Sequence, residues 1–184
     1  MSATLKKLIM VLAVSVFILF IILLIAAWNM GAFAPVEVTS AERGPYYFVS
    51  LHHKGSYSQI VEKIQTVENM LKEKNIPFIR TAGIFYDNPA YIKPEDLRSN
   101  GGCIVSDSVK VDTPFVFMTI PKRQVAIAKI EASPAIAPFK TYPALFDWMQ
   151  ENDMVADEGQ ITFEMYFTEG FVEVEMPIKI VEEK

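Results

Sequence analysis

The distribution of apolar residues divides the chain into two parts. Residues 8–28 (LIMVLAVSVFILFIILLIAAW) contain no charged side chain, and Ser15 is their only clearly polar position. About 20 helical residues cross the hydrocarbon core of a bilayer, so this segment predicts a membrane-spanning helix. Trp28 would then lie at the membrane–water boundary, where indole rings collect. The pattern divides the rest into a short tail (1–7), a linker (29–35) and one domain (36–182).

In the first half of the domain, the pattern predicts a strand, a helix and two more strands. Residues 45–53 (PYYFVSLHH) are rich in aromatic and β-branched residues, as in a strand. Ser56 and Gln59 have the spacing of a helix capping box. Apolar residues then recur at helical intervals, at Ile60, Ile64, Val67 and Leu71. A strand is expected at 78–86, a loop at 91–100 around Pro94, and a short strand at 103–105.

The second half repeats this order of elements. A strand is predicted at 124–131, followed by an irregular connector at 133–138 and a helix at 141–151, with Thr141 as its N-cap and Pro143 in its first turn. Strands at 160–167 and 171–180 form a hairpin through residues 168–170. The chain is therefore predicted to be an α+β protein built from two βαββ modules.

The segment 161–167 (ITFEMYF) alternates cleanly between apolar and polar residues. Its apolar side (Ile161, Phe163, Met165 and Phe167) is expected to meet the helices. The other side presents Thr162, Glu164 and Tyr166. Two interpretations stay open: a sheet face that is simply wet, or a pocket in which Glu164 is the anionic floor for a cationic or amphipathic ligand.

Several short motifs resemble one known family. They are FVSLHHKGSYSQI, FYDNP, PEDLR, APFKTYPALFDWM, FEMYF and VEVEMPIKI, between residues 48 and 180. They resemble the GyrI-like effector-binding domain, which includes the ligand-binding halves of drug-sensing transcription regulators. The resemblance implies a pseudo-twofold pair of βαββ modules with a central cleft. It also implies that Glu164 reaches this cleft, and that Tyr166, Trp148 and Tyr86 are further ligand-binding residues.

Charge and the apolar segment exclude part of that family's function. The chain of 184 residues has a net charge of −5 and a pI near 5.1, whereas binding to nucleic acid needs a clustered basic surface. The apolar helix also stands where such regulators carry a helix-turn-helix. We therefore expect no nucleic-acid partner.

The remaining reactive residues predict neither a metal site nor a cofactor. His52 and His53 are neighbours on a strand and point to opposite faces, so they do not share a metal. Cys103 lies in an apolar run and is expected to be a buried small hydrophobic residue. A haem pocket, suggested for the distantly similar SOUL fold, is not expected either.

The flanks of the apolar segment bear on its fate and orientation. The alternative is a cleaved signal peptide, because Ala32, Phe33 and Ala34 have the small-x-small spacing of a cleavage site. Against it, the apolar run is longer than that of a signal peptide, and Pro35 would directly follow the cleavage site, where proline is a poor fit. Lys6 and Lys7 precede the segment and acidic residues dominate after it, which predicts a cytoplasmic N-terminus. The domain then lies on the non-cytoplasmic side, in the periplasm if the cell is bacterial.

Three functions follow from these residues. The first is a membrane-tethered module that binds a small amphipathic or cationic ligand, or a peptide, at Glu164. The second is a hydrolase of reactive small molecules, in which Glu164 activates water. The third is an adaptor that binds a protein partner and whose cleft is filled by Tyr46, Phe85 or Trp148.

Overall fold

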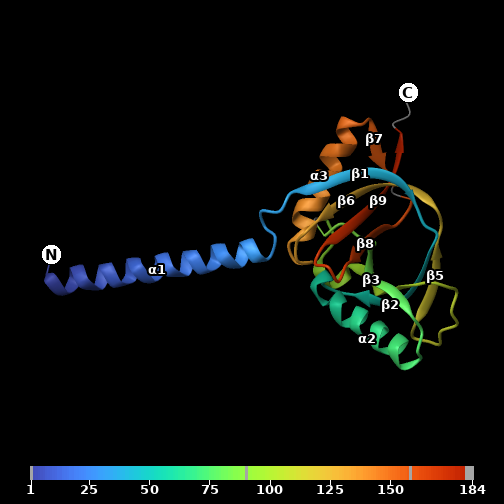
Figure 1. The fold of residues 1–184 in the computed structure, drawn as a ribbon, viewed down its shortest axis with the longest axis horizontal. Helices are drawn as coiled ribbons and strands as arrows, with labels where there is room; N and C mark the ends of the chain where they lie inside the picture. The colour runs from blue at the N-terminus through green and yellow to red at the C-terminus, as the bar shows by residue number, and fades with distance from the viewer. Residues whose placement is uncertain (1, 90, 158, 181–184) are drawn as a thin grey trace.

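A computed structural model describes residues 2–89, 91–157 and 159–180 of the chain. Residue 1 of the predicted tail and residues 181 and 182 of the predicted domain lie outside the described residues. A long helix, α1 (Ala3–Asn29), projects from a domain made of one large sheet and two helices, α2 (Ile60–Glu73) and α3 (Ala137–Glu151) (Figure 1). The α+β class is confirmed.

All ladders of the sheet are antiparallel. Its strands are β1 (Val36–Arg43), β2 (Tyr46–Lys54), β3 (Phe78–Phe85), β4 (Arg98–Val105), β5 (Val116–Ile120), β6 (Arg123–Ile130), β7 (Met154–Ala156), β8 (Thr162–Tyr166) and β9 (Val172–Ile180). Two short 3₁₀ turns, η1 (Tyr57–Gln59) and η2 (Pro94–Asp96), interrupt the loops of the first half.

The strand order confirms the duplication. The order is β1-β6-β9-β8-β3-β4-β2-β5, with β7 added to β9. The modules are β2-α2-β3-β4 and β6-α3-β8-β9. Counted outward from the centre of the sheet, the strands of the first module follow the order β3, β4, β2 and those of the second the order β8, β9, β6, so corresponding strands occupy equivalent places. The second strand of each module lies innermost, so that β3 pairs with β8 at the pseudo-twofold axis, where Gly83 faces Glu164.

A two-stranded ribbon joins the outer ends of the two modules. β1 continues into β2 through the bend at Gly44, and β5 continues into β6 through Pro121. Arg43 pairs with Arg123 and Tyr46 with Ile120, so the register runs unbroken through both bends. Because β2 and β6 belong to opposite modules, the ribbon makes the sheet curl around one of its faces.

The curled sheet encloses a core of its own. The buried members of this enclosed cluster all come from strands, and they are Phe48, Ala82, Ile84, Ile104, Ile120, Phe163 and Met165. The opposite face is covered by the helices. α2 packs on β2 and β4 through residues such as Val67 and Leu71, and α3 packs on β6 and β9 through Leu145 and Met149. The enclosed cluster thus lies on one face of the sheet, and two helix-covered clusters lie on the other.

Several predicted boundaries were wrong in the first half. The capping box does not form, because the Ser56 hydroxyl bonds to Ser58, and η1 precedes the helix, which begins at Ile60. The predicted loop at 91–100 ends early, since β4 begins at Arg98. The edge strands β1 and β5 were not predicted. β1 (VEVTSAER) has few apolar residues and so a weak apolar signal, whereas β5 (VFMTI) is mostly apolar but only five residues long.

The predicted start of the second helix was also wrong. α3 begins at Ala137, inside the expected irregular connector, and Pro138 lies in its first turn. Pro143 is therefore an interior residue. Thr141 is not an N-cap either, because its hydroxyl donates to the carbonyl of Ala137 one turn earlier. Proline is tolerated in the first turn of a helix, and here the first of the two prolines has that role. The short strand β7 after α3 was not predicted.

Gly102 offers a test of the β2–β4 contact. A Cβ at Gly102 would overlap the carbonyl oxygen of Val49. We expect Gly102→Ala to lower the free energy of unfolding by at least about 2 kcal/mol, because backbone must move. Denaturant unfolding of the full chain in detergent, followed by near-UV circular dichroism, measures this. Gly159→Ala is the control, since a Cβ at Gly159 would lie 3.5 Å from its nearest neighbour, Oδ1 of Asp157. Equal losses for both variants would contradict the prediction.

Candidate functional site

Glu164 lies at the centre of the sheet, on the face covered by the helices. β8 places it opposite Gly83 of β3 and Val174 of β9. Because side chains alternate along a strand, Phe163 and Met165 point into the enclosed cluster instead. The alternation of β8 was predicted correctly, but the assignment of its faces was wrong. The apolar side meets other strands and the Glu164 side meets α3, because the curled sheet supplies a second core.

Two phenols hold the carboxylate of Glu164. The Tyr142 hydroxyl donates to Oε1 (2.8 Å) and the Tyr166 hydroxyl donates to Oε2 (3.2 Å). Tyr142 comes from α3 and Tyr166 from β8, so helix and strand both fix the acid. Glu164 is only 4% exposed. The carboxylate is thus buried with one neutral donor on each oxygen.

Burial dominates the titration of this cluster. It raises the pKa of Glu164, and the hydrogen bonds from Tyr142 and Tyr166 lower that pKa by a smaller amount. Burial, followed by the charge of Glu164, raises the pKa of both phenols well above the ordinary tyrosine value. The phenols therefore stay protonated donors, while Glu164 is the group that can change its charge.

The first module closes the other side of the site with aromatic and aliphatic groups. A Cβ added to Gly83, the partner of Glu164, would lie 3.0 Å from the ring of Phe85 and 3.2 Å from Ile60. Tyr57 packs edge-to-face on Phe85, with ring centroids 4.8 Å apart. The space over Gly83 is therefore filled by side chains of β3 and α2, and Phe85 is one of the three residues expected to fill the cleft in an adaptor.

The structure brings together two of the four residues expected at the site. Tyr166 bonds directly to Glu164. Trp148 packs with its α3 neighbours against the cluster that contains Leu145 and Met149. Tyr86 follows β3 directly after Phe85 and is 40% exposed, and the charge of Arg98 acts on its phenol. For Trp148 and Tyr86 a ligand-binding role stays a prediction.

Sequence analysis missed Tyr142, which makes the shorter hydrogen bond to Glu164. It lies within the family-like motif APFKTYPALFDWM, so the motif contained it. The helix was expected to begin at Thr141, however, which left Tyr142 in a first turn without a defined face. With α3 beginning at Ala137, Tyr142 is an interior helical position directed at the sheet.

A second buried carboxylate, Glu175, was also missed, and its surroundings differ. It lies on β9 and points to the enclosed side of the sheet, where the Tyr46 hydroxyl donates to it (2.6 Å) and Arg123 forms an ion pair with it (3.2 Å). Arg43 lies 3.6 Å away. Burial raises the pKa of Glu175, while Tyr46 and the arginines lower it. Tyr46 thus belongs to this ion-paired cluster and does not fill the space near Glu164.

The other reactive residues have structural surroundings. Cys103 is fully buried, as predicted, and burial raises the pKa of its thiol to about 12. His53 is buried with Nε2 3.0 Å from the Ser56 carbonyl oxygen, whereas His52 is exposed and its Nδ1 lies 3.1 Å from Asn100. The two rings lie on opposite faces of β2.

Comparisons with known proteins agree with this architecture. The model of the GyrI-like small molecule binding domain matches residues 37–179. The C-terminal domain of EcmrR is similar in structure (TM-score 0.66, 15% identity, 79% of this chain and 99% of that one). A hydrolase encoded by lin2189 from Listeria innocua is also similar in structure (TM-score 0.58, 12% identity, 78% of this chain and 92% of that one). So is SAV2435 bound to tetraphenylphosphonium (TM-score 0.52, 12% identity, 78% of this chain and 94% of that one). At such identities these structures share the fold. No curated protein matches the sequence.

The raised pKa of Glu164 predicts how stability depends on pH. An acid with a higher pKa in the folded state binds more protons when folded, so its contribution to stability falls as pH rises from its unfolded to its folded pKa. Glu164→Gln removes this loss. We expect the melting temperature of the variant to rise relative to wild type as pH increases from the ordinary glutamate pKa toward the raised pKa of folded Glu164. Thermal unfolding of both full-length proteins across this range tests it; a difference that shrinks with pH contradicts it. Glu175 is common to both proteins and cancels.

Removing either phenol should raise the pKa of Glu164 further. Each hydroxyl favours the ionised carboxylate, and Tyr142 makes the shorter bond. We therefore expect a larger increase for Tyr142→Phe than for Tyr166→Phe, measured by carboxyl ¹³C NMR titration. Tyr91→Phe is the control, because Tyr91 is 85% exposed. An unchanged pKa in Tyr142→Phe would show that this bond does not stabilise the ionised form.

Proposed function

Because this chain belongs to the GyrI-like small molecule binding domain family, we propose that it binds an amphipathic or lipophilic cation at Glu164. The ligand would lie between the two βαββ modules, with its charge on the carboxylate and its apolar part among the surrounding aromatic rings. We further propose that α1 anchors this binding domain in a membrane.

The observation that carries the proposal is the missing counter-charge of Glu164. Among the described residues, its hydrogen bonds come from two phenols, and none of the salt bridges found there includes it. Glu175, equally buried in the same sheet, is paired with Arg123. An ionised carboxylate inside a protein needs a charge partner or several donors. A cationic ligand would supply the partner that the chain provides to Glu175 but not to Glu164.

Binding at this site requires side chains to move. Glu164 is 4% exposed and is covered by Tyr142 and Tyr166. A tyrosine ring can rotate about χ1 and then present its face to a cation, which exchanges a hydrogen bond for a cation–π contact. SAV2435, whose fold this chain shares, is a protein bound to tetraphenylphosphonium, a large lipophilic cation. This supports the class of ligand proposed here.

The anchor rests on the length and composition of α1. The helix has 27 residues and no buried residue, and an 18-residue window within it has a mean hydropathy of 3.5, so it is long and apolar enough to cross a bilayer. A signal sequence near the N-terminus has the same properties. Lys6 and Lys7 at its start support a cytoplasmic N-terminus and a domain on the other side. N-terminal sequencing of the protein recovered from membranes separates an anchor, which keeps residues 3–29, from a cleaved signal.

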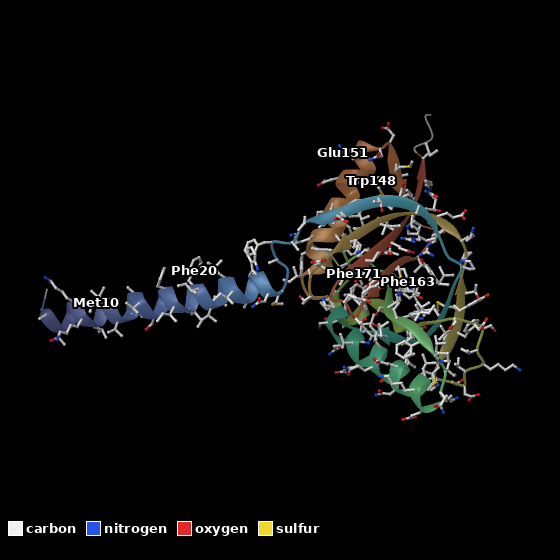
Figure 2. All side chains as sticks on the ribbon, viewed as in Figure 1. Met10, Phe20, Trp148, Glu151, Phe163 and Phe171 are labelled. Carbon is white, nitrogen blue, oxygen red and sulfur yellow. The ribbon has the colours of Figure 1, made fainter. Side chains whose placement is uncertain are left out.

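Titration with tetraphenylphosphonium tests the binding proposal. We expect the full chain in detergent to bind it, and Glu164→Gln to weaken binding at least about tenfold, because a buried charge pair is worth more than 1.4 kcal/mol. Wild-type affinity should increase with pH as Glu164 ionises. Calorimetry measures both effects, and Glu151→Gln is a matched control at the exposed end of α3 (Figure 2). Binding that is equal in wild type and Glu164→Gln would exclude this site, and no binding at all would favour the adaptor function.

A hydrolase is the second candidate. The raised pKa of the Glu164 carboxyl suits a general base, and a protein of this fold from Listeria innocua is described as a hydrolase. Glu164 would take a proton from water while the water oxygen bonds to an epoxide carbon and the C–O bond of the ring breaks; the protonated Glu164 then returns the proton to the alkoxide, beside Tyr166. Epoxides and activated cyclopropanes are suitable substrates for an assay of the full chain. Equal rates in wild type and Glu164→Ala would reject this function.

A further inference from the structure

The end of α1 is fixed to the domain by backbone contacts. The N–H of Ser133 donates to the carbonyl of Met30 (3.0 Å), and the Lys140 ammonium donates to the carbonyls of Ala32 and Ala34. Gly31 lies so close to the backbone of residues 131 and 132 that a Cβ would overlap it. The helix therefore meets the domain at one defined place, the loop between β6 and α3, which is also visible in Figure 1.

A groove opens beside this junction. Its volume is about 290 Å³, and its lining comes from the last turn of α1, the loop after β6 and the β8–β9 hairpin. The lining residues are Asn29, Glu131, Ala132, Ser133, Pro134, Tyr166, Phe167, Gly170, Phe171 and Val172. Figure 2 shows Phe171 on the side of the domain that faces α1. Glu131 contributes an acidic side chain to the lining.

Tyr166 connects this groove to the candidate site. It belongs to the lining, while its hydroxyl lies 3.2 Å from Glu164. The adjoining wall is fixed, because Phe167 stacks on Phe171 at 3.9 Å, with Arg80 over the ring of Phe167 and Lys129 over that of Phe171. Rotation of Tyr166 would therefore open the groove toward the carboxylate while the hairpin stays in place.

Two further observations concern the contents and the depth of the groove. The Ser133 hydroxyl is buried beside the groove and has no hydrogen-bond partner within the described part of the chain. Large aromatic side chains are exposed around the junction: Trp28 (73%), Phe33 (60%) and Phe139 (79%). Indole rings collect at the bilayer interface. Trp28, one residue before Asn29 of the groove lining, would therefore place the mouth of the groove at headgroup depth if α1 spans the membrane.

We propose that the groove is an entrance through which a ligand dissolved in the bilayer reaches Glu164 without first passing through water. This rests on the proposed function. A lipophilic cation concentrates at the interface, where its charge meets the headgroups and its apolar part the acyl chains. It would enter beside Asn29, pass Glu131 and Ser133, and displace Tyr166 from Glu164.

An entrance and a binding site have different kinetic signatures. Narrowing an entrance slows association and dissociation equally and leaves the Kd unchanged, whereas damage to the site changes the Kd. We expect Asn29→Trp and Glu131→Trp, each at an exposed lining position, to lower both rate constants for rhodamine 6G at least fivefold with an unchanged Kd. Stopped-flow fluorescence with the full chain in phosphatidylcholine nanodiscs measures the rates.

The control is Gln150→Trp, an exposed position in a separate surface groove, of about 360 Å³, beside α3 and β7. It should leave both rate constants unchanged. If Glu164→Gln loses binding while both groove variants keep wild-type rates, the entrance is overturned and the proposed function stands. If Glu164→Gln binds rhodamine 6G as wild type does, the proposed function fails and the entrance fails with it.

Discussion

The pairing of β3 with β8 is the contact on which the rest of this structure depends. It joins two βαββ modules into one sheet and brings Gly83 opposite Glu164 at their boundary. The ribbon formed by β1 with β6 and β2 with β5 then ties the outer strands together in one register. A sheet held at its centre and at both ends curls, and one face becomes a core that needs no helix. The helices are left to cover the other face, and the candidate site lies there.

The two buried glutamates of this sheet have different partners. Glu175 points into the enclosed face, where Arg123 and Tyr46 neutralise and bond it, which is the arrangement of a structural ion pair. Glu164 points to the helix-covered face and has two neutral donors. Burial of an acid without a counter-charge costs stability, and such costs are typical of functional sites. This difference in partners, and not burial itself, separates the binding candidate from the structural acid.

The position of α1 determines how the candidate site would face a membrane under the proposed anchoring. Its last turn contributes Asn29 to a groove whose wall includes Tyr166, and Tyr166 bonds Glu164. A tethered domain of this design would sample ligands at the interface, where lipophilic cations are most concentrated. The anchor would then determine which ligands arrive, in addition to where the domain is held.

The sequence by itself determined the apolar helix, the order of elements within the two βαββ modules, the duplication and the alternation along β8, because these follow from local periodicity. It also singled out Glu164 and Tyr166 through a family resemblance. It missed the half-exposed edge strands β1 and β5 and assigned the faces of β8 wrongly, because both depend on how the sheet closes. Tyr142 and the partners of Glu175 were decided only by the tertiary structure. They lie 22 and more residues from the acids they bond. Contacts at such separation depend on packing between modules, which no local pattern records.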